Sequence, residues 1–220
     1  MLTFLLVSSA LAKDAKIPAI AAATEITWMG IDLTRAEFYI PEAFTMTGAS
    51  YTWVGGMTYP VYIPAQEKVI NTPKEAIEAF SGGWNELFRK ESLDELADFT
   101  KKKITNGVTT TMGPTKSDGA ATWFHMESGS TKETTMTEAT VAEMVKGYPA
   151  AALGMVMIAD RFSKEDEEGC FWPVLYDKDY AVVWTERMCG ETRGLGLRNF
   201  YYSPVKEILE KIEDARKKEW

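Results

Sequence analysis

Tyr180-Ala-Val-Val-Trp-Thr-Glu-Arg-Met188, Cys189-Gly-Glu-Thr-Arg-Gly-Leu-Gly-Leu-Arg-Asn-Phe-Tyr-Tyr202 and Ser203-Pro-Val-Lys-Glu-Ile-Leu-Glu210 form one continuous stretch that decides the fold. Its first part has the β-branched and aromatic character of a buried strand. Its last part opens with Ser203-Pro204, a helix-start signal in which Ser203 would be the N-cap, and then repeats apolar residues at helical spacing. The stretch predicts a strand, a glycine-rich turn and a C-terminal helix.

Outward from this stretch, strand and helix patterns follow one another in mixed order. Further strands are expected at 25–32, 36–40, 108–112, 120–126, 153–159 and 171–176. Further helices are expected from 72, at 92–103, and from 135 or 137 to about 146. The apolar run Leu153–Ala159 is the expected central strand, and residues 160–169 are expected to form a polar loop. The pattern predicts the α/β class, of α+β type: a mixed, largely antiparallel sheet with helices packed on it.

The boundary between the two expected middle helices rests on Ser92-Leu-Asp-Glu95. A Ser followed three residues later by Glu matches a capping box, so a new helix is expected to start there and to end by Asn106-Gly107. In the helix before it, Gly82 and Gly83 indicate close packing or a kink.

Length and composition indicate one domain. The chain has 220 residues, 45% hydrophobic and 25% charged, enough for a single sizeable core. A net charge of −8 argues against a nucleic-acid partner. Residues 41–64 form a Gly-, Thr- and aromatic-rich insertion, expected as a long ordered loop or an added hairpin. Its aromatic residues either form a recognition surface or cap the core.

The N-terminal residues Met1–Ala12 are apolar and end in Ala10-Leu11-Ala12, the small-x-small pattern of a signal-peptide cleavage site. The run is too short to span a bilayer, and its alternative is a buried N-terminal strand. We therefore expect a signal peptide at 1–12, a loose leader at 13–24 and a single domain at 25–220. This organisation predicts an extracytoplasmic (periplasmic or secreted) protein with no transmembrane segment in the mature chain.

The two cysteines, Cys170 and Cys189, fall on the two arms of a hairpin expected around Asp177-Lys178-Asp179. Strict pairing centred on Lys178 sets Cys170 opposite residue 186 or 187, which is too far from Cys189 for a disulfide. A bulge, at Pro173 or beside Gly190, would correct the register. We predict a disulfide that contributes about 3 kcal/mol.

Three segments resemble a family of small secreted bacterial proteins of unknown function. They are Thr27-Trp28-Met-Gly30-Ile-Asp32, Trp84-Asn85-Glu-Leu87-Phe88 and the segment from Gly190 through Gly194-Leu-Gly196-Leu-Arg198-Asn199-Phe200. The family carries a Trp-x-Gly-x-Asp, a Trp-Asn and a Gly-Gly-x-Gly-x-Arg-Asn-Tyr-Trp segment in this order. The likeness is dense only at these places, and residues 41–64 and position 193 depart from it. The resemblance implies an extracytoplasmic α/β domain and no particular reaction.

The best candidate binding site is the turn from Gly190 to Asn199, where glycines allow close backbone approach and two arginines can hold a carboxylate or phosphate. The candidate ligand-binding residues are Arg193, Gly194, Gly196, Arg198 and Asn199. The alternative is that the glycines form a bulged edge and that Arg198 pairs with an internal acid such as Asp32.

Other chemistry finds weaker support in the sequence. His125 is the one histidine, Ser203-Pro-Val-Lys206 matches an acyl-transfer motif only in part, and Glu165–Glu168 lacks the pattern of a calcium loop. Each favours a structural interpretation, and no catalytic residue, metal or cofactor is predicted. The expected function is a non-catalytic module that binds a protein, peptide or envelope component through its sheet edge or aromatic loop. The alternative is an enzyme acting on an anionic small molecule or cell-wall fragment, with Arg193 and Arg198 as anion clamps.

Overall fold

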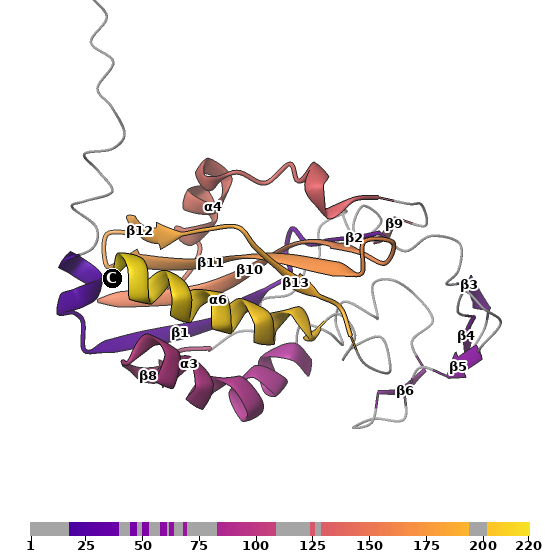
Figure 1. Cartoon of the computed structure of the whole chain (residues 1–220), viewed down its shortest axis with the longest axis horizontal. Helices are drawn as coiled ribbons and strands as arrows, with labels where there is room; N and C mark the ends of the chain where they lie inside the picture. Colours follow the sequence, from indigo (N-terminus) through magenta and orange to yellow (C-terminus); the bar gives the residue numbers. More distant parts are fainter. Residues whose placement is uncertain are drawn as a thin grey trace, which may run out of the picture.

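A mixed sheet with helices on both faces forms the body of the molecule (Figure 1). The computed structural model describes residues 18–39, 45–47, 50–52, 58–60, 62–63, 68–69, 83–108, 124–125, 129–193 and 202–220. The strands of the main sheet are β1 (Glu25–Asp32), β2 (Glu37–Tyr39), β8 (Lys103–Asn106), β9 (Phe124–His125), β10 (Leu153–Ser163), β11 (Glu168–Asp177), β12 (Val182–Thr185) and β13 (Met188–Glu191). The longer helices are α3 (Leu93–Thr100), α4 (Glu138–Val145) and α6 (Pro204–Glu219), with a 3-10 turn η3 at Thr131–Glu133.

The strand order β12-β11-β10-β1-β8 confirms the mixed sheet, and β10 is its central strand as predicted. β11 pairs antiparallel with β10, β12 and β13, whereas β1 pairs in parallel with β10 and β8. β2 adds to the far end of β10 and carries β9, both in parallel. The two halves differ in direction because β10–β13 follow one another through tight turns, while β1 reaches its neighbours only through long connections.

Two smaller sheets belong to the predicted insertion and the residues after it. β3 (Thr45–Thr47), β4 (Ser50–Thr52) and β5 (Thr58–Pro60) form an antiparallel three-stranded sheet, and β6 (Tyr62–Ile63) pairs with β7 (Lys68–Val69). The side chains of this region, and with them the predicted aromatic surface, lie outside the described residues.

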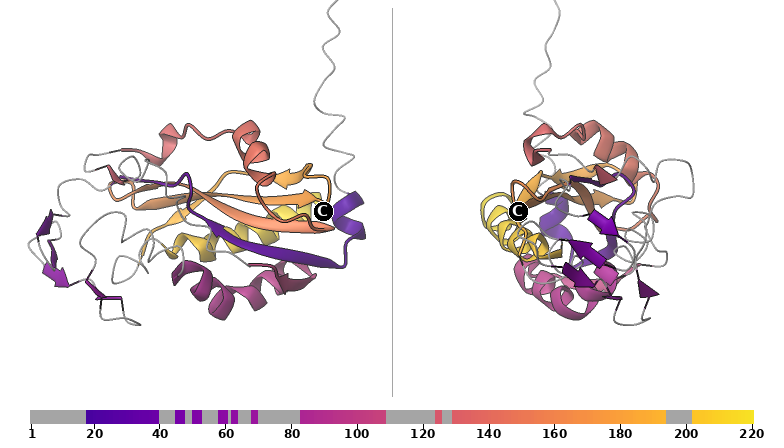
Figure 2. Two further views of the ribbon diagram at one scale, coloured as in Figure 1. Left: turned by 180° about the vertical axis from the view of Figure 1, so that it is seen from behind. Right: turned by 90° about the vertical axis from the view of Figure 1, so that its right-hand side faces the viewer.

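Each face of the main sheet has its own core. On one face, Trp28, Met155 and Phe162 pack against α3 and α6. On the other face, Val156, Ile158 and Val174 pack against α4 through Val141 and Val145. Figure 2 shows the same arrangement, with α4 on one side of the sheet and α3 and α6 on the other. The predicted C-terminal helix and the helix beginning after Thr137 are confirmed.

The helix through Ser92 is continuous, which corrects the predicted boundary. A helical segment at 83–87 runs through a π turn, η1 (Phe88–Ser92), directly into α3. The Ser92 side chain makes no capping hydrogen bond but is buried and bonded to the hydroxyl of Tyr202, 3.1 Å away. The extra residue of the π turn keeps Phe88 in the core, stacked on Trp28 at 4.0 Å. The helix ends at Lys101, in the left-handed conformation, and Lys103–Asn106 form β8 instead of helix.

The predicted polar loop at 160–169 is also wrong. β10 continues to Ser163, a turn covers residues 164–167, and β11 starts at Glu168. The pairing of β10 with β11 shifts by one residue between Ala159 and Phe162, which marks a β-bulge. The bulge places Asp160 and Arg161 next to each other at the end of the apolar run, so the strand looks finished in the sequence although Phe162 is fully buried.

The hairpin of β11 and β12 turns at residues 177–181, and its register differs from the prediction. Asp177 and Ala181 share the closing backbone hydrogen bond, and a bulge lies at Val183. Together they move β13 so that Cys189 lies directly opposite Cys170. The predicted disulfide is present, with Cα atoms 4.0 Å apart. Pro173 interrupts the ladder where β12 gives way to β13, but the correcting bulge lies at Val183.

Some of the predicted segments lie outside the described residues. Residues 1–17, which hold the expected signal peptide, are among them, whereas residues 18–22 of the expected leader are helical and Ile20 is buried in the core. Most of the expected strands at 108–112 and 120–126 is also outside; His125 belongs to β9, which pairs with β2. Among the described helices, we find none with the length and hydrophobicity needed to cross a membrane.

Candidate functional site

The bulge in β10 gathers a set of polar side chains. They lie beside η3, on the same face of the sheet as α4 but beyond the part that α4 covers (Figure 1). Because two residues of β10 oppose one residue of β11, Asp160 and Arg161 contact the same neighbour, η3 and the residues beside it. Both are almost fully buried. With their partners they form what we call the polar cluster: Glu37, Thr131, Glu133, Thr134, Asp160, Arg161, Asp166, Glu168 and Arg187.

Asp160 and Arg187 form the central ion pair of the polar cluster. Arg187 Nε donates to Asp160 Oδ2 at 2.6 Å, and the two side chains are 21% and 5% exposed, respectively. Thr134 donates its hydroxyl to the other carboxylate oxygen at 2.7 Å. Arg187 Nη2 also donates to the backbone carbonyl of Thr131 at 2.5 Å. This pair ties the segment between β12 and β13 to η3.

Arg161 is held from three sides. Its guanidinium donates to the backbone carbonyl of Glu133 and lies 3.7 Å from the carboxylate of Glu37. It also covers the ring of Tyr39 at 4.0 Å, and His125 stacks on the same ring with centroids 4.3 Å apart. His125 therefore lies in an aromatic stack, in line with its predicted structural role.

The acidic run at 165–168 supplies two structural carboxylates. Asp166 accepts hydrogen bonds from the backbone N–H of Thr131 at 2.7 Å and from the hydroxyls of Ser130 and Thr131. Burial alone would raise the pKa of Asp166, but these hydrogen bonds outweigh it and lower the pKa. Glu168 accepts from the Thr131 hydroxyl at 2.5 Å. These carboxylates anchor η3.

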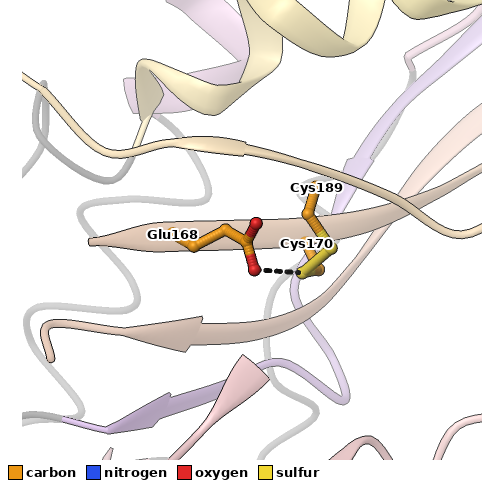
Figure 3. Close-up of side chains that lie close together, drawn as sticks. All are labelled: Glu168, Cys170 and Cys189. Atoms are coloured by element: carbon orange, nitrogen blue, oxygen red, sulfur yellow. Dashed lines mark hydrogen bonds between the residues drawn. A yellow bond between two sulfur atoms is a disulfide. The ribbon is translucent and has the colours of Figure 1, made fainter. Parts of the chain in front are cut away.

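Beside the polar cluster lies the disulfide of Cys170 and Cys189, with Glu168 turned toward it (Figure 3). Glu168 Oε2 is 3.8 Å from Cys170 Sγ, and Arg187 Nη1 is 3.4 Å from Cys189 Sγ. Glu168 and the two cysteines lie close enough together to hold a metal ion. Both sulfurs, however, are bonded to each other in the disulfide and cannot act as thiolate ligands. As it stands, the trio offers one carboxylate, too few ligands for a zinc site.

The predicted glycine and arginine site is described only at its start. Arg193 is exposed and its guanidinium pairs with Glu191, with Glu207 3.9 Å away, so an anion would have to displace carboxylates. The other predicted ligand-binding residues, Gly194, Gly196, Arg198 and Asn199, lie outside the described residues.

Asp32, the suggested partner of Arg198, accepts hydrogen bonds from the hydroxyl of Tyr148 and from the backbone N–H of Thr34. Just before it, Gly30 follows a bulge in β1 with a φ of 109°, a conformation that favours glycine. In the second segment of the family resemblance, Asn85 pairs with both backbone groups of Ile31. The Trp-x-Gly-x-Asp and Trp-Asn segments thus meet in space.

Ser203 has a different role from the predicted helix cap. Its hydroxyl accepts from the backbone N–H of Arg193 at 2.5 Å and donates to the carbonyl of Glu191 at 3.1 Å, while no capping bond forms. It therefore joins the start of α6 to the end of β13, which supports the structural interpretation of Ser203-Pro-Val-Lys206.

Two of the described edges of the sheet, those of β13 and β8, differ in what lies along them. Along β13, α6 takes the place of a further strand: Lys211 donates to the carbonyl of Cys189, and Glu207 accepts from the N–H of Glu191 at 3.2 Å. Along β8, Lys103 and Gly107 direct their N–H groups to β1. Because backbone groups alternate along a strand, those of Ile104 and Asn106 point away from the sheet.

Sequence reasoning missed the polar cluster because it assigned Asp160 and Arg161 to a loop. The signal was an acid and a base following an apolar strand without any turn residue between them.

Comparisons of the chain with models of protein families, with curated proteins and with solved structures found no match.

Proposed function

We propose that this chain is an extracytoplasmic module that binds, without chemical change, an extended, acidic segment of a partner protein as an added strand along β8. The observation that carries the proposal is the pair of outward backbone positions at Ile104 and Asn106. An extended peptide can satisfy such groups by continuing the ladder of the sheet.

The geometry of β8 suits an added strand. Lys103, Thr105 and Asn106 are exposed, and Ile104 is half-buried against the core. The strand is held on its inner side by four residues of β1, from Glu25 to Trp28. In the described part of the chain, this edge has no counterpart to the α6 side chains that occupy the β13 edge.

Local charge selects an acidic segment. Although the whole chain carries a net charge of −8, Lys101-Lys102-Lys103 leads into this edge. Lys101 and Lys103 are exposed, while Lys102 donates to the carbonyl of Ala23 at 2.5 Å. Lys103 pairs with the carboxylate of Glu25 at 3.0 Å. The excess of positive charge beside β8 favours carboxylates on the incoming strand.

Binding without chemical change agrees with the state of the buried charges. Asp160, Arg161 and Arg187 are each bonded to other groups of the polar cluster, and these bonds join separate segments of the fold. Arg193 of the alternative, enzymatic interpretation is likewise paired with Glu191. These charges hold segments of the fold together.

Support for an extracytoplasmic location comes from three features. The disulfide between Cys170 and Cys189 is typical of oxidising compartments. The apolar run Met1–Ala12 has the pattern of a signal peptide, and the resemblance to secreted proteins points in the same direction.

The test compares two substitutions at one edge position. Asn106→Pro removes the outward N–H without touching a hydrogen bond to β1, and Asn106→Ala removes the side chain but keeps that N–H. Wild-type protein is used to select binders from a displayed library of random peptides. We expect selected peptides rich in Asp and Glu, with affinity for the Pro variant about tenfold lower, as the loss of one backbone hydrogen bond predicts. The Ala variant should bind nearly as wild type.

Hydrogen exchange identifies the edge that is used. Binding of a selected peptide should slow exchange of the amides of Ile104 and Asn106. Peptides that bind all three proteins equally, with no protection at β8, would refute the proposal.

A further inference from the structure

The two sulfurs of the disulfide lie in opposite electrostatic surroundings. Cys189 is partly exposed, and the guanidinium of Arg187 is 3.4 Å from its Sγ atom. Cys170 is fully buried, and the carboxylate of Glu168 is 3.8 Å from its Sγ atom. A cation beside a sulfur stabilises its thiolate, and a carboxylate beside a buried sulfur favours the neutral thiol. The two cysteines are therefore expected to differ in reactivity once the bond opens.

We infer that Cys170 and Cys189 form a thiol–disulfide exchange centre for dithiol or disulfide substrates, in which Cys189 is the sulfur that bonds to the substrate. A purely structural disulfide needs neither a charged partner for each sulfur nor a difference in exposure between them. Here Arg187 is fixed toward Cys189 by Asp160 and by the carbonyl of Thr131, so its position does not depend on the disulfide.

The exchange begins when the thiolate of an external dithiol attacks Sγ of Cys189. The S–S bond breaks, its electron pair passes to Sγ of Cys170, and that sulfur takes up a proton from the solvent; the carboxylate of Glu168, 3.8 Å away, favours this neutral form. The second thiolate of the substrate then attacks the substrate sulfur of the mixed disulfide. Cys189 leaves as a thiolate beside Arg187. Two electrons have entered the chain, and the substrate has become a disulfide.

The reverse sequence reduces a substrate disulfide, and the same groups keep their places. The Cys189 thiolate attacks one sulfur of the substrate disulfide and expels the other sulfur as a thiolate. Cys170 then loses its proton to the solvent, attacks Sγ of Cys189 and expels the remaining substrate sulfur as the second thiolate. Closure needs little movement because the two residues are a directly opposed pair in the ladder between β11 and β13. The pairs on either side of them, formed by Gly169 and Phe171 with β13, hold this register in the reduced form.

The test uses two variants that remove the same disulfide and leave different sulfurs. Cys170→Ser keeps Cys189, and Cys189→Ser keeps Cys170. Each is treated with oxidised glutathione at neutral pH, and the mixed disulfide is followed by mass spectrometry. We expect Cys170→Ser to react at least about tenfold faster, because it retains the partly exposed thiol beside Arg187. Equal rates, or a faster reaction of Cys189→Ser, would overturn the inference.

Exposure alone would also favour Cys189, so the pH profile separates charge from access. In Cys170→Ser the reaction rate should reach its half-maximum below about pH 8.5, the pKa of a free cysteine thiol. Adding Arg187→Met should move this midpoint upward, and Arg187→Lys should restore it. A midpoint at or above about 8.5 in Cys170→Ser would show that Arg187 does not activate Cys189. The pH profile of Cys170→Ser is measured with Arg187 in place. It therefore tests whether the Cys189 thiol is activated even if Arg187→Met does not fold.

Discussion

Removing Arg187 should destabilise the protein more than removing the charge of its partner. In Arg187→Met, the hydroxyl of Thr134 is the hydrogen-bond donor that the described residues still offer the carboxylate of Asp160, whose side chain is 5% exposed in the wild-type structure. An uncompensated buried charge costs about 3–5 kcal/mol in the free energy of unfolding. Asp160→Asn leaves an amide that can still bond to Thr134 and should cost about 1–3 kcal/mol.

The double variant tests whether these costs come from one shared interaction. With both charges gone, no unpaired charge remains, so the double variant should lose about 1–3 kcal/mol less than the sum of the single losses. Urea unfolding followed by tryptophan fluorescence measures all four proteins. The exposed pair of Lys103 and Glu25, 3.0 Å apart, is the control: Lys103→Met should change stability far less.

Additive losses for Asp160 and Arg187 would refute this reasoning. Additivity to within about 0.5 kcal/mol would mean that the two side chains do not depend on each other in the folded state. A change in the slope of the unfolding curve would instead mean that a substitution altered the compactness of one state, and the comparison would then need a second probe.

Three further predictions concern stability. Gly190→Ala should cost about 1–3 kcal/mol, because the added Cβ would lie 2.8 Å from the carbonyl oxygen of Pro204 and push α6 off β13; thermal unfolding measures this loss. Burial, then the charge of a neighbouring tyrosine, raises the pKa of Tyr176 to about 12. Its contribution to stability is complete below the usual pKa of about 10 and should be lost as the pH rises through about 12; Tyr176→Phe should flatten this decline in alkaline unfolding. Reduction of the bond between Cys170 and Cys189 should lower the free energy of unfolding by about 3 kcal/mol, as seen in urea titrations with and without a dithiol.

Elements with regular periodicity were predictable from the sequence. The apolar spacing of Val205, Ile208, Leu209 and Ile212 defines the buried face of α6, and all four are fully buried. The continuous run beginning at Leu153 likewise marks the central strand. In both cases the local pattern and the tertiary environment agree, so the pattern was sufficient.

Features created by one extra residue were not predictable. The π turn ending at Ser92, the β10 bulge at Asp160 and the bulge at Val183 each add a residue that shifts the period of everything after it. The same residues carried misleading local signals, since Ser92 completes a capping box in the sequence but bonds to Tyr202 in the fold. Whether a helix or strand accommodates an extra residue as a π turn or a bulge depends on how distant segments pack against it. The residues next to that position in the sequence do not show this packing.

The bulge of β10 divides one strand into two of opposite parity. Odd-numbered residues up to Ala159 face the core beneath α6, and after the bulge the even-numbered Phe162 does so. A deletion of Arg161 would remove the extra residue and leave a regular strand in which Phe162 still faces the core, whereas a deletion elsewhere in β10 would exchange the faces of the residues on one side of it. β10 should thus tolerate the loss of one residue at the bulge better than the loss of one residue anywhere else along the strand.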